Sequence, residues 1–264
     1  MCNLDGPQDL CGSDVHVWVV RLKASNQRLN QLFSSLSADE KQRSGEFKTE
    51  HLRNRFVISR GMLRALLGAY LGIPPCDIRF SYSSNGKPSL FSSNRVLDFN
   101  ISHSGNLGVY SFARACQLGI DVEQIRDIPE IGLIARHCFS AEEAAELETV
   151  DIQRRVASFC ACWTRKEAYL KATGEGLSGE LRRFRVTVLP DAPAALVHVN
   201  GDDAEARLWS LYELLPDSGY IGALAFRGKR SVWISRCMEA EQLLTRSESA
   251  GELLAPLSSR TCEN

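Results

Sequence analysis

The sequence predicts an α+β protein built from two similar lobes. The order strand, long helix, then several strands occurs once before about residue 115 and again after it, although no strong residue-level repeat links the two halves. A length of 264 residues suits one large domain or two small lobes, and 44% hydrophobic with 24% charged residues is typical of a globular chain. We therefore expect a loose N-terminus over residues 1–14, an N-terminal lobe over 15–115, a C-terminal lobe over 116–237 and a tail over 238–264.

The first half contains signals for one strand, a long helical stretch and a group of short strands. The alternating, β-branched run 15–20 predicts the first strand. Ser37 and Glu40 are spaced as in a capping box, and apolar residues then recur at helical spacing until Gly72 and the following prolines. Strands are predicted over 78–82, 97–102 and 107–112, with a turn at 85–88.

The second half repeats this order. A strand over 117–123 is followed by helices over 140–149 and about 154–173, the second ending at Gly174. Short strands are then predicted over 184–188, 196–199, 206–211, 220–226 and 232–235. The residues from about 239 onward are polar and Ser-rich around one apolar helix candidate, which predicts a loosely held tail.

The charge balance excludes general nucleic-acid binding, because the formal net charge is −1. Between Lys41 and Arg64, however, the sequence contains seven basic residues and only two acidic ones, so this helical stretch is locally positive. No apolar run approaches the ~20 residues that span a membrane. Residues 1–14 have neither the basic nor the apolar region of a secretory signal, so we expect a cytoplasmic protein with reduced thiols. The scattered cysteines do not form a zinc-binding set.

Two carboxylates lie two residues apart in the strand predicted over 117–123. Asp121 and Glu123 therefore project from one face, and Ile120 and Val122 project from the other. At ~4 Å and an effective dielectric constant near ~20, like charges repel by about 4 kcal/mol, so a partly buried pair needs a shared proton or a bound cation. On spacing alone, the simpler interpretation is a solvent-facing strand edge.

Glu167 and Lys171 lie four residues apart on one face of the long helix. Alone, such a pair is a surface ion pair contributing ~0.3–0.5 kcal/mol. If Glu167 meets Asp121 and Glu123, the three oxygen ligands suit Mg²⁺ with waters and phosphate oxygens, and Lys171 can neutralise the same phosphate. Together these residues predict a metal and phosphate site.

Residues 100–105 end a strand with a hydroxyl, an imidazole and a glycine, and three interpretations stay open. Ser102 or Ser104 with His103 is one nucleophile–base pair, although the Gly-x-Ser-x-Gly elbow is absent. The same donors suit a phosphate, and a solvated turn histidine is equally simple. The turn at 85–88 is by default a hairpin turn from which Lys87 can contact a ligand.

Four motifs, in this order and spacing, resemble the Sfp-type 4'-phosphopantetheinyl transferases from about Leu36 to Phe226. They are Asn85-Gly86-Lys87-Pro88, Phe99-Asn100-Ile101-Ser102-His103-Ser104, Gly119-Ile120-Asp121-Val122-Glu123 and Trp163-x-x-Lys166-Glu167-Ala168-x-x-Lys171, with Gly174-Glu175-Gly176-Leu177 after them. The resemblance implies two lobes in a pseudo-two-fold arrangement with the active site between them. It also implies transfer of the 4'-phosphopantetheine arm of coenzyme A to a carrier-protein serine, with release of adenosine 3',5'-bisphosphate.

The resemblance also implies roles for individual residues. Asp121, Glu123 and Glu167 would hold Mg²⁺, or Mn²⁺, on the coenzyme A pyrophosphate, and Lys171 would reach the phosphate under attack. Glu143 falls where some family members carry an acid proposed to assist deprotonation. The implied coenzyme A contacts are Arg55, Arg60, Asn85, Gly86, Lys87, Asn100, Ser102, His103 and Lys171, with Arg43 behind the first two. Glu40 departs from some relatives, which have a lysine there.

The implied partners are coenzyme A and an acyl or peptidyl carrier protein of fatty-acid, polyketide or nonribosomal-peptide synthesis. Because both lobes lie in one chain, we expect a monomer. Two other classes of function compete with transfer. One is a Mg²⁺-dependent phosphohydrolase that uses the same acids with water as nucleophile, and the other is a non-catalytic coenzyme A- or carrier-binding module.

Overall fold

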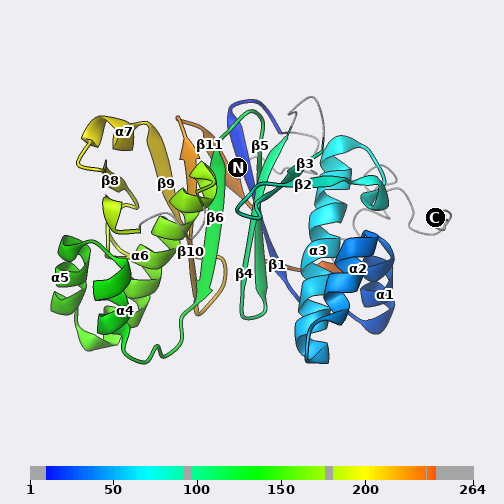
Figure 1. Cartoon of the computed structure of the whole chain (residues 1–264), viewed down its shortest axis with the longest axis horizontal. Coiled ribbons are helices and arrows are strands. Elements are labelled where there is room, and N and C mark those ends of the chain that lie inside the picture. Colours follow the sequence, from blue (N-terminus) through cyan, green and yellow to red (C-terminus); the bar gives the residue numbers. More distant parts are fainter. Residues whose placement is uncertain (1–9, 92–96, 176–180, 236, 242–264) are drawn as a thin grey trace.

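The computed structural model describes residues 10–91, 97–175, 181–235 and 237–241. Two lobes lie side by side, with their sheets at the centre of the molecule and their helices on the two outer flanks (Figure 1). The α+β architecture with two similar lobes is thus confirmed.

The N-terminal lobe is a sheet covered by helices on one face. Its strands run in the order β11-β1-β5-β4, with β12 also beside β1. The elements of this lobe in the first half of the chain are β1 (Asp14–Arg21), α1 (Asn26–Ser34), α2 (Ala38–Gly45), α3 (Glu50–Leu71), a 3-10 turn (Pro75–Asp77), β2 (Phe80–Tyr82), β3 (Pro88–Leu90), β4 (Asp98–Ser104) and β5 (Leu107–Ala113).

The C-terminal lobe has a smaller sheet in the order β6-β10-β9 and a separate β7–β8 pair. Its long helix lies along the first strand. Its elements are β6 (Leu118–Gln124), α4 (Ile131–Cys138), α5 (Ala141–Thr149), α6 (Ile152–Thr173), a 3-10 turn (Leu181–Arg183), β7 (Phe184–Val186), β8 (Leu196–Val199), α7 (Asp203–Arg207), β9 (Trp209–Leu214) and β10 (Tyr220–Arg227).

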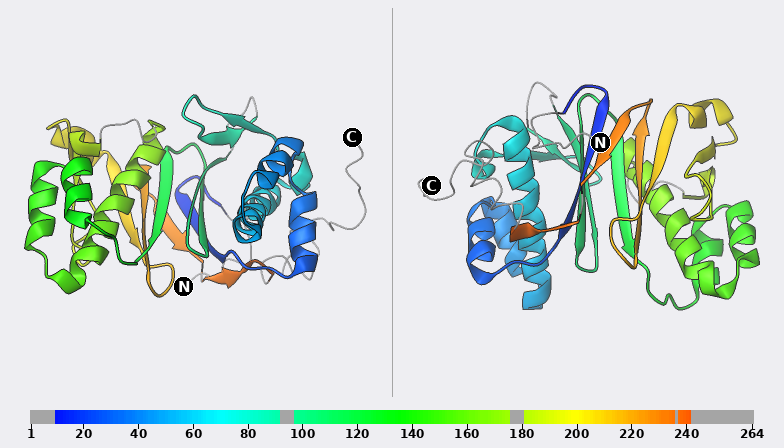
Figure 2. Two further views of the ribbon diagram at one scale, coloured as in Figure 1. Left: turned by 60° about the horizontal axis from the view of Figure 1, so that its bottom comes forward. Right: turned by 180° about the vertical axis from the view of Figure 1, so that it is seen from behind.

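The end of the described chain returns to the N-terminal lobe. β11 (Ser231–Ile234) and β12 (Met238–Glu239) both pair in parallel with β1, and Ser235 Oγ accepts a hydrogen bond from Val19 N (Figure 2). The C-terminal lobe therefore ends earlier than the expected boundary at 237. The apolar helix candidate of the tail lies outside the described residues.

The two lobes have the same topology. In the N-terminal lobe, β1 pairs antiparallel with β5, and β5 pairs antiparallel with β4. In the C-terminal lobe, β6 pairs antiparallel with β10, and β10 pairs antiparallel with β9. The orders β1-β5-β4 and β6-β10-β9 therefore correspond. The long helices α3 and α6 each contain 22 residues and each end at a glycine in the left-handed region, Gly72 and Gly174. This equivalence bears out the pseudo-two-fold arrangement.

A residue-level repeat that the sequence does not reveal lies in the core. Each lobe has a short helix that begins with a capping box, Ser37 with Glu40 in α2 and Ser140 with Glu143 in α5. Each capping-box glutamate forms a buried ion pair with a cation of the long helix, Glu40 with Arg64 and Glu143 with Lys166. The same device thus fixes a short helix against a long one twice.

Local capping explains where the structure departs from the predicted elements. The helical stretch predicted from Ser37 to Leu71 is interrupted, because Thr49 Oγ1 accepts a hydrogen bond from Leu52 N and starts α3 anew. The strand predicted over 206–211 starts only at Trp209, because residues 206 and 207 belong to helix α7. The Asp202 carboxylate caps the N-terminus of that helix. Helices α1 and α4 are not predicted by the sequence pattern.

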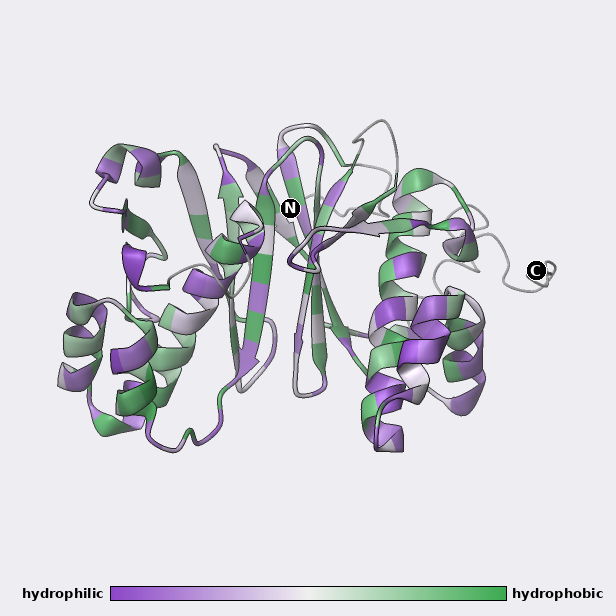
Figure 3. Cartoon of the chain, viewed as in Figure 1, coloured by the Kyte–Doolittle hydropathy of each residue, from purple (hydrophilic) through white to green (hydrophobic). Residues whose placement is uncertain are grey.

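Three hydrophobic clusters hold the layers together. One lies between α3 and the larger sheet, one between α6 and the smaller sheet, and the third, around Val17, Val109, Ile120 and Phe226, joins the two sheets. Hydrophobic and hydrophilic residues alternate along β6, whereas α2 is mostly hydrophilic (Figure 3). Among the described residues, no helix is long and apolar enough to cross a membrane.

Candidate functional site

The acids of β6 face the long helix α6. Ile120 and Val122 are buried in the cluster between the sheets, so the alternating Asp121 and Glu123 point to the other side. Asp121 is only 4% exposed, and Glu123 is half-buried. A solvent-facing strand edge, the simpler interpretation of the sequence, is therefore wrong for Asp121.

Helix α6 brings Glu167 and Lys171 to the same place. Lys171 Nζ donates to Asp121 Oδ1 at 2.7 Å, to Ser102 Oγ at 3.0 Å and to the Ile120 carbonyl at 3.2 Å. The Glu167 side chain is buried, and its pKa responds to Asp121, Lys171 and Glu123. Glu167 and Lys171 are thus linked to β6 and do not form a separate surface pair.

The contact between β6 and α6 requires a glycine in the strand. A Cβ on Gly119 would lie 2.2 Å from the Ala168 carbonyl oxygen and 2.4 Å from Ala172 N, both backbone atoms of α6. The helix backbone therefore lies against the strand backbone directly beside Asp121. This close approach lets side chains of both elements meet over a short distance.

Burial among like charges raises the pKa of two of these carboxyl groups. Desolvation, followed by the Asp121 charge, raises the pKa of Glu167 to about 7 despite the opposing effect of Lys171. Desolvation also raises the pKa of Glu123, and its hydrogen bond from Ser104 opposes this shift. The site therefore contains more negative charge than Lys171 alone neutralises.

Strand β4 supplies a row of polar side chains along β6. Ser102 Oγ donates to Asp121 Oδ1 at 2.7 Å, and Ser104 Oγ donates to Glu123 Oε2 at 2.7 Å. The Asn100 side-chain oxygen accepts a hydrogen bond from Ile120 N. These contacts join the lobes and orient both acids, whereas the resemblance assigned Asn100 and Ser102 to coenzyme A.

The donor set fits a hard divalent cation. Asp121 Oδ2 and Glu167 Oε1 are buried without a hydrogen-bond partner in the described structure, which is costly unless something else satisfies them. Carboxylate oxygens without histidine or cysteine suit Mg²⁺ or Mn²⁺. As the side chains stand, however, the described residues include no group of three acidic, histidine or cysteine side chains placed to hold a metal. A metal held by all three acids would therefore require their side chains to move.

The predicted turn at residues 85–88 lies against the end of α6. Asn85 Nδ2 donates to the carbonyl oxygens of Gly174 and Glu175, both at 3.0 Å. Lys87 Nζ donates to the carbonyl oxygens of Lys171 and Leu118. Gly86 is in the left-handed region with φ of 76°, as the tight turn requires. Asn85 and Lys87 thus tie the N-terminal lobe to the helix that holds Glu167.

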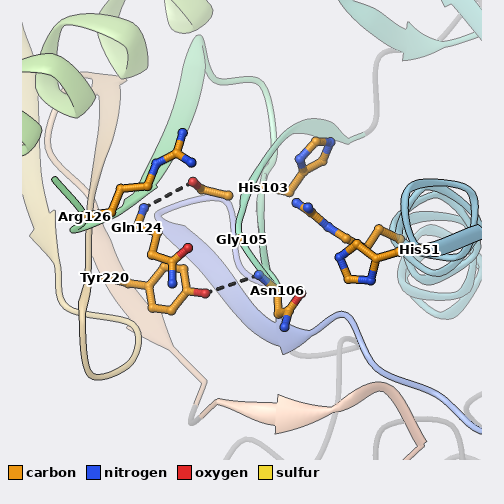
Figure 4. A pocket seen from close by; sticks show the side chains of 9 residues that line it. His51, His103, Gly105, Asn106, Gln124, Arg126 and Tyr220 are labelled. Atoms are coloured by element: carbon orange, nitrogen blue, oxygen red, sulfur yellow. Dashed lines mark hydrogen bonds between the residues drawn. The ribbon is translucent and has the colours of Figure 1, made fainter. Parts of the chain in front are cut away.

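A polar pocket of about 470 Å³ lies where the β4–β5 turn meets both lobes (Figure 4). The N-terminal lobe contributes His51 and Arg55 from α3, and the C-terminal lobe contributes Arg126 and Tyr220. Tyr220 OH accepts a hydrogen bond from Asn106 N in the turn. The full lining is His51, Arg55, His103, Ser104, Gly105, Asn106, Gln124, Arg126 and Tyr220.

The pocket is rich in groups that bind anions. Desolvation, and then the positive charge of Arg55, lower the pKa of His103. Arg60 lies on α3, as Arg55 does. Its Nε is 3.9 Å from Glu40 Oε1, and its guanidinium group lies over the Phe80 ring. His103 therefore lies within range of the positive charges of Arg55, Lys171 and Arg60, each of which lowers its pKa.

Comparison with known proteins assigns both halves of the chain. Residues 21–113 match the family described as 4'-phosphopantetheinyl transferase, N-terminal, and residues 117–225 match the 4'-phosphopantetheinyl transferase superfamily. The chain is 36% identical over 222 residues to 4'-phosphopantetheinyl transferase HetI of Nostoc sp., covering 83% of this chain and 90% of that protein. This chain belongs to the 4'-phosphopantetheinyl transferase superfamily. The transferase moves phosphopantetheine to carrier proteins.

More distant relatives cover smaller parts of the transferase. It is 30% identical over 208 residues to human L-aminoadipate-semialdehyde dehydrogenase-phosphopantetheinyl transferase, covering 73% of this chain and 67% of that one. The crystal structure of Thermotoga maritima holo-acyl-carrier-protein synthase has a TM-score of 0.33 and 22% identity, covering 43% of this chain and 63% of that chain.

The Glu143 carboxylate is enclosed by contacts within the C-terminal lobe of the transferase. Its side chain is fully buried, Oε2 accepts from Ser140 N and from Lys166 Nζ at 2.8 Å, and Oε1 accepts from Val186 N at 2.7 Å. A carboxylate enclosed in this way has no access to a substrate hydroxyl in this conformation. The contacts of Glu143 in this conformation are therefore structural, and its expected part in deprotonation stays a prediction.

Several residues of the site were not singled out from the sequence. His51, Arg126 and Tyr220 line the pocket, yet each comes from a segment with no distinctive motif. One signal was available for Arg126, because it lies three residues after Glu123, just beyond the end of β6. The pocket was missed because it joins four segments that are separated in the sequence.

Proposed function

We propose that the transferase takes phosphopantetheine from coenzyme A bound at the junction of the lobes, with Mg²⁺ or Mn²⁺ held by Asp121, Glu123 and Glu167. The observation that carries this proposal is the convergence of these acids with Lys171, including the unpartnered oxygens Asp121 Oδ2 and Glu167 Oε1. When bound, the cation would neutralise the pyrophosphate and stabilise charge that develops on it.

The N-terminal lobe holds the adenosine phosphate end in this proposal. Arg55, Arg60 and His103 offer positive or hydrogen-bonding groups beside the pocket, and Arg forms strong charge-assisted bonds to phosphate. Asn85 and Lys87 serve mainly to hold the loop against the end of α6, since their side chains already donate to carbonyl groups there, and Gly86 serves the turn between them.

Lys171 is the cation that meets the phosphate under attack. The serine oxygen of the carrier protein loses its proton to water and forms a bond to the phosphorus attached to pantetheine, while the anhydride bond to adenosine 3',5'-bisphosphate breaks. Such a transfer depends on positioning and charge neutralisation more than on covalent help from the protein. Lys171 Nζ already donates to Asp121 and Ser102, so its ammonium group is held beside the acids.

One chain provides both sides of this site, so we propose that the monomer is active. The test is the intact mass of several purified acyl and peptidyl carrier proteins after incubation with coenzyme A and the transferase, with and without Mg²⁺. Gain of a phosphopantetheine mass only with Mg²⁺ supports the proposal. Release of adenosine bisphosphate without any carrier protein would instead indicate a phosphohydrolase.

A further inference from the structure

The ion pair between Glu143 and Lys166 is among the most buried polar groups in the described structure. Both side chains are 0% exposed, and their charged atoms are 2.8 Å apart. Lys166 Nζ also donates to the carbonyl oxygens of Leu181 at 2.8 Å and Phe184 at 2.6 Å, so all three of its protons are used. Its ammonium group lies over the Phe184 ring, 4.4 Å from the centroid.

This pair fixes helix α6 at the turn that bears the site. Lys166 directly precedes Glu167, and Lys171 follows one turn later. On the opposite side of that turn, Gly119 brings β6 against the backbone of Ala168 and Ala172. The helix is therefore held from both sides, and a rotation of α6 would move Glu167 relative to Asp121.

The N-terminal lobe contains the same device without the acids of the site. Glu40 Oε2 accepts from Arg64 Nε at 2.6 Å, and Arg64 also donates to the carbonyl oxygens of Pro75 and Ile78. The Arg64 guanidinium lies over the Phe80 ring, as Lys166 lies over Phe184. The second oxygen of Glu40 is 3.9 Å from Arg60 Nε.

We propose that Glu143 and Lys166 are positioning residues for Glu167 and Lys171, and that Glu40 and Arg64 do the same for Arg60. This inference depends on the proposed function, because it assigns catalysis to α6 and coenzyme A binding to α3. The two pairs have matching burial and partners but support different functional side chains. Their loss should therefore cause similar destabilisation and different kinetic defects.

The experiment compares one pair with the other in the full chain. Glu143→Gln and Lys166→Met should each lower kcat by about 10- to 100-fold with the KM for coenzyme A changed less than about threefold, since a small displacement of catalytic groups has effects of this size. Glu40→Gln and Arg64→Met should raise that KM by about tenfold with kcat changed less than about threefold. Thermal unfolding of all four variants checks that loss of either pair destabilises the protein to a similar extent, as the kinetic comparison requires.

Two further variants keep the test informative if a single substitution unfolds the protein. Lys166→Arg should retain at least about a third of wild-type kcat, because arginine serves the same contacts at position 64. The double variant Glu143→Gln with Lys166→Met should be no less active than the less active of the two single variants, since the effects of substitutions in one interacting unit are not additive.

Three outcomes would overturn the inference. The first is the same split between kcat and KM for both pairs, and the second is full activity of Glu143→Gln and Lys166→Met. The third is loss of activity in Glu143→Gln with normal activity in Lys166→Met, which would make Glu143 a base acting alone. Failure of the proposed function is recognised separately, because Glu167→Gln, assayed alongside, would then transfer at the wild-type rate.

Discussion

The two lobes differ most at the contact between the first strand and the long helix. In the N-terminal lobe this contact is neutral, because Trp18 Nε1 of β1 donates to Tyr70 OH of α3. In the C-terminal lobe the corresponding contact is ionic, between Asp121 of β6 and Lys171 of α6. The same topology therefore supports a packed core on one side and a charged site on the other.

The lobes also present opposite charges where they meet. Helix α3 directs Arg55 towards the pocket and places Arg60 near it, whereas β6 and α6 present Asp121, Glu123 and Glu167. We interpret this difference as a division of labour, in which the N-terminal lobe binds phosphate and the C-terminal lobe carries the chemistry. The following predictions test that division.

Removing a site acid from the C-terminal lobe should have the largest effect. Asp121→Ala should lower the rate of carrier loading by at least ~10³-fold, because it removes a proposed metal ligand and the partner that orients Lys171. Intact-mass assays over time give the rate. Glu148→Gln, which affects only an exposed ion pair with Arg136, is the control and should load the carrier normally. Normal loading by Asp121→Ala would remove that lobe from the chemistry.

Separating the C-terminal strand from its helix should have the next largest effect. Gly119→Ala places a methyl group against the α6 backbone, so we expect about a 100-fold lower transfer rate and a lower Tm. Gly132→Ala is the matched control, because its nearest atom is Arg136 Nη1 at 3.6 Å. Unchanged activity in Gly119→Ala would show that the β6–α6 contact tolerates a shift.

Removing a cation from the N-terminal lobe should weaken binding more than chemistry. Arg55→Ala should raise the KM for coenzyme A by about tenfold, with kcat within about threefold of wild type. His103→Ala should show the same pattern. Arg53→Ala, on the same helix but stacked over Phe33, should leave both constants unchanged. A large fall in kcat without a change in KM would contradict the division between the lobes.

The pH dependence of cation binding should show the smallest effect. Because the pKa of Glu167 is raised to about 7, this carboxyl group is largely protonated below that pH and ionised above it. Affinity for Mg²⁺ should therefore increase by up to about tenfold between pH 6 and pH 8. Calorimetric titration of wild type and Glu167→Gln measures this change, and an equally steep dependence in Glu167→Gln would assign it to another group.

The sequence predicted the parts of the fold and site that depend on local spacing. Alternation along residues 117–123 placed Asp121 and Glu123 on one face of a strand, and the i to i+4 spacing placed Glu167 and Lys171 on one face of a helix. The meeting of these two faces is a tertiary contact that no local pattern contains. Only the resemblance to the family predicted it from the sequence.

Buried polar groups were the hardest to predict. Glu143 and Glu40 have the spacing of exposed capping residues, yet each is enclosed by a cation from a helix that follows later in the chain. Lys87 similarly binds backbone carbonyl groups of the other lobe. The partner of a buried charge depends on the assembled core, so neither the burial nor the role of these residues can be read from spacing.

The division between the lobes is tested most directly by measuring coenzyme A binding and single-turnover transfer on the same preparations of Glu167→Gln and Arg55→Ala. We expect Glu167→Gln to bind coenzyme A without Mg²⁺ within about threefold of wild type but to transfer at least ~100-fold more slowly. Arg55→Ala should show the reverse, weak binding with near-normal transfer at saturation. Transfer at the wild-type rate by Glu167→Gln, or equal loss of coenzyme A affinity in both variants, would contradict the division between the lobes.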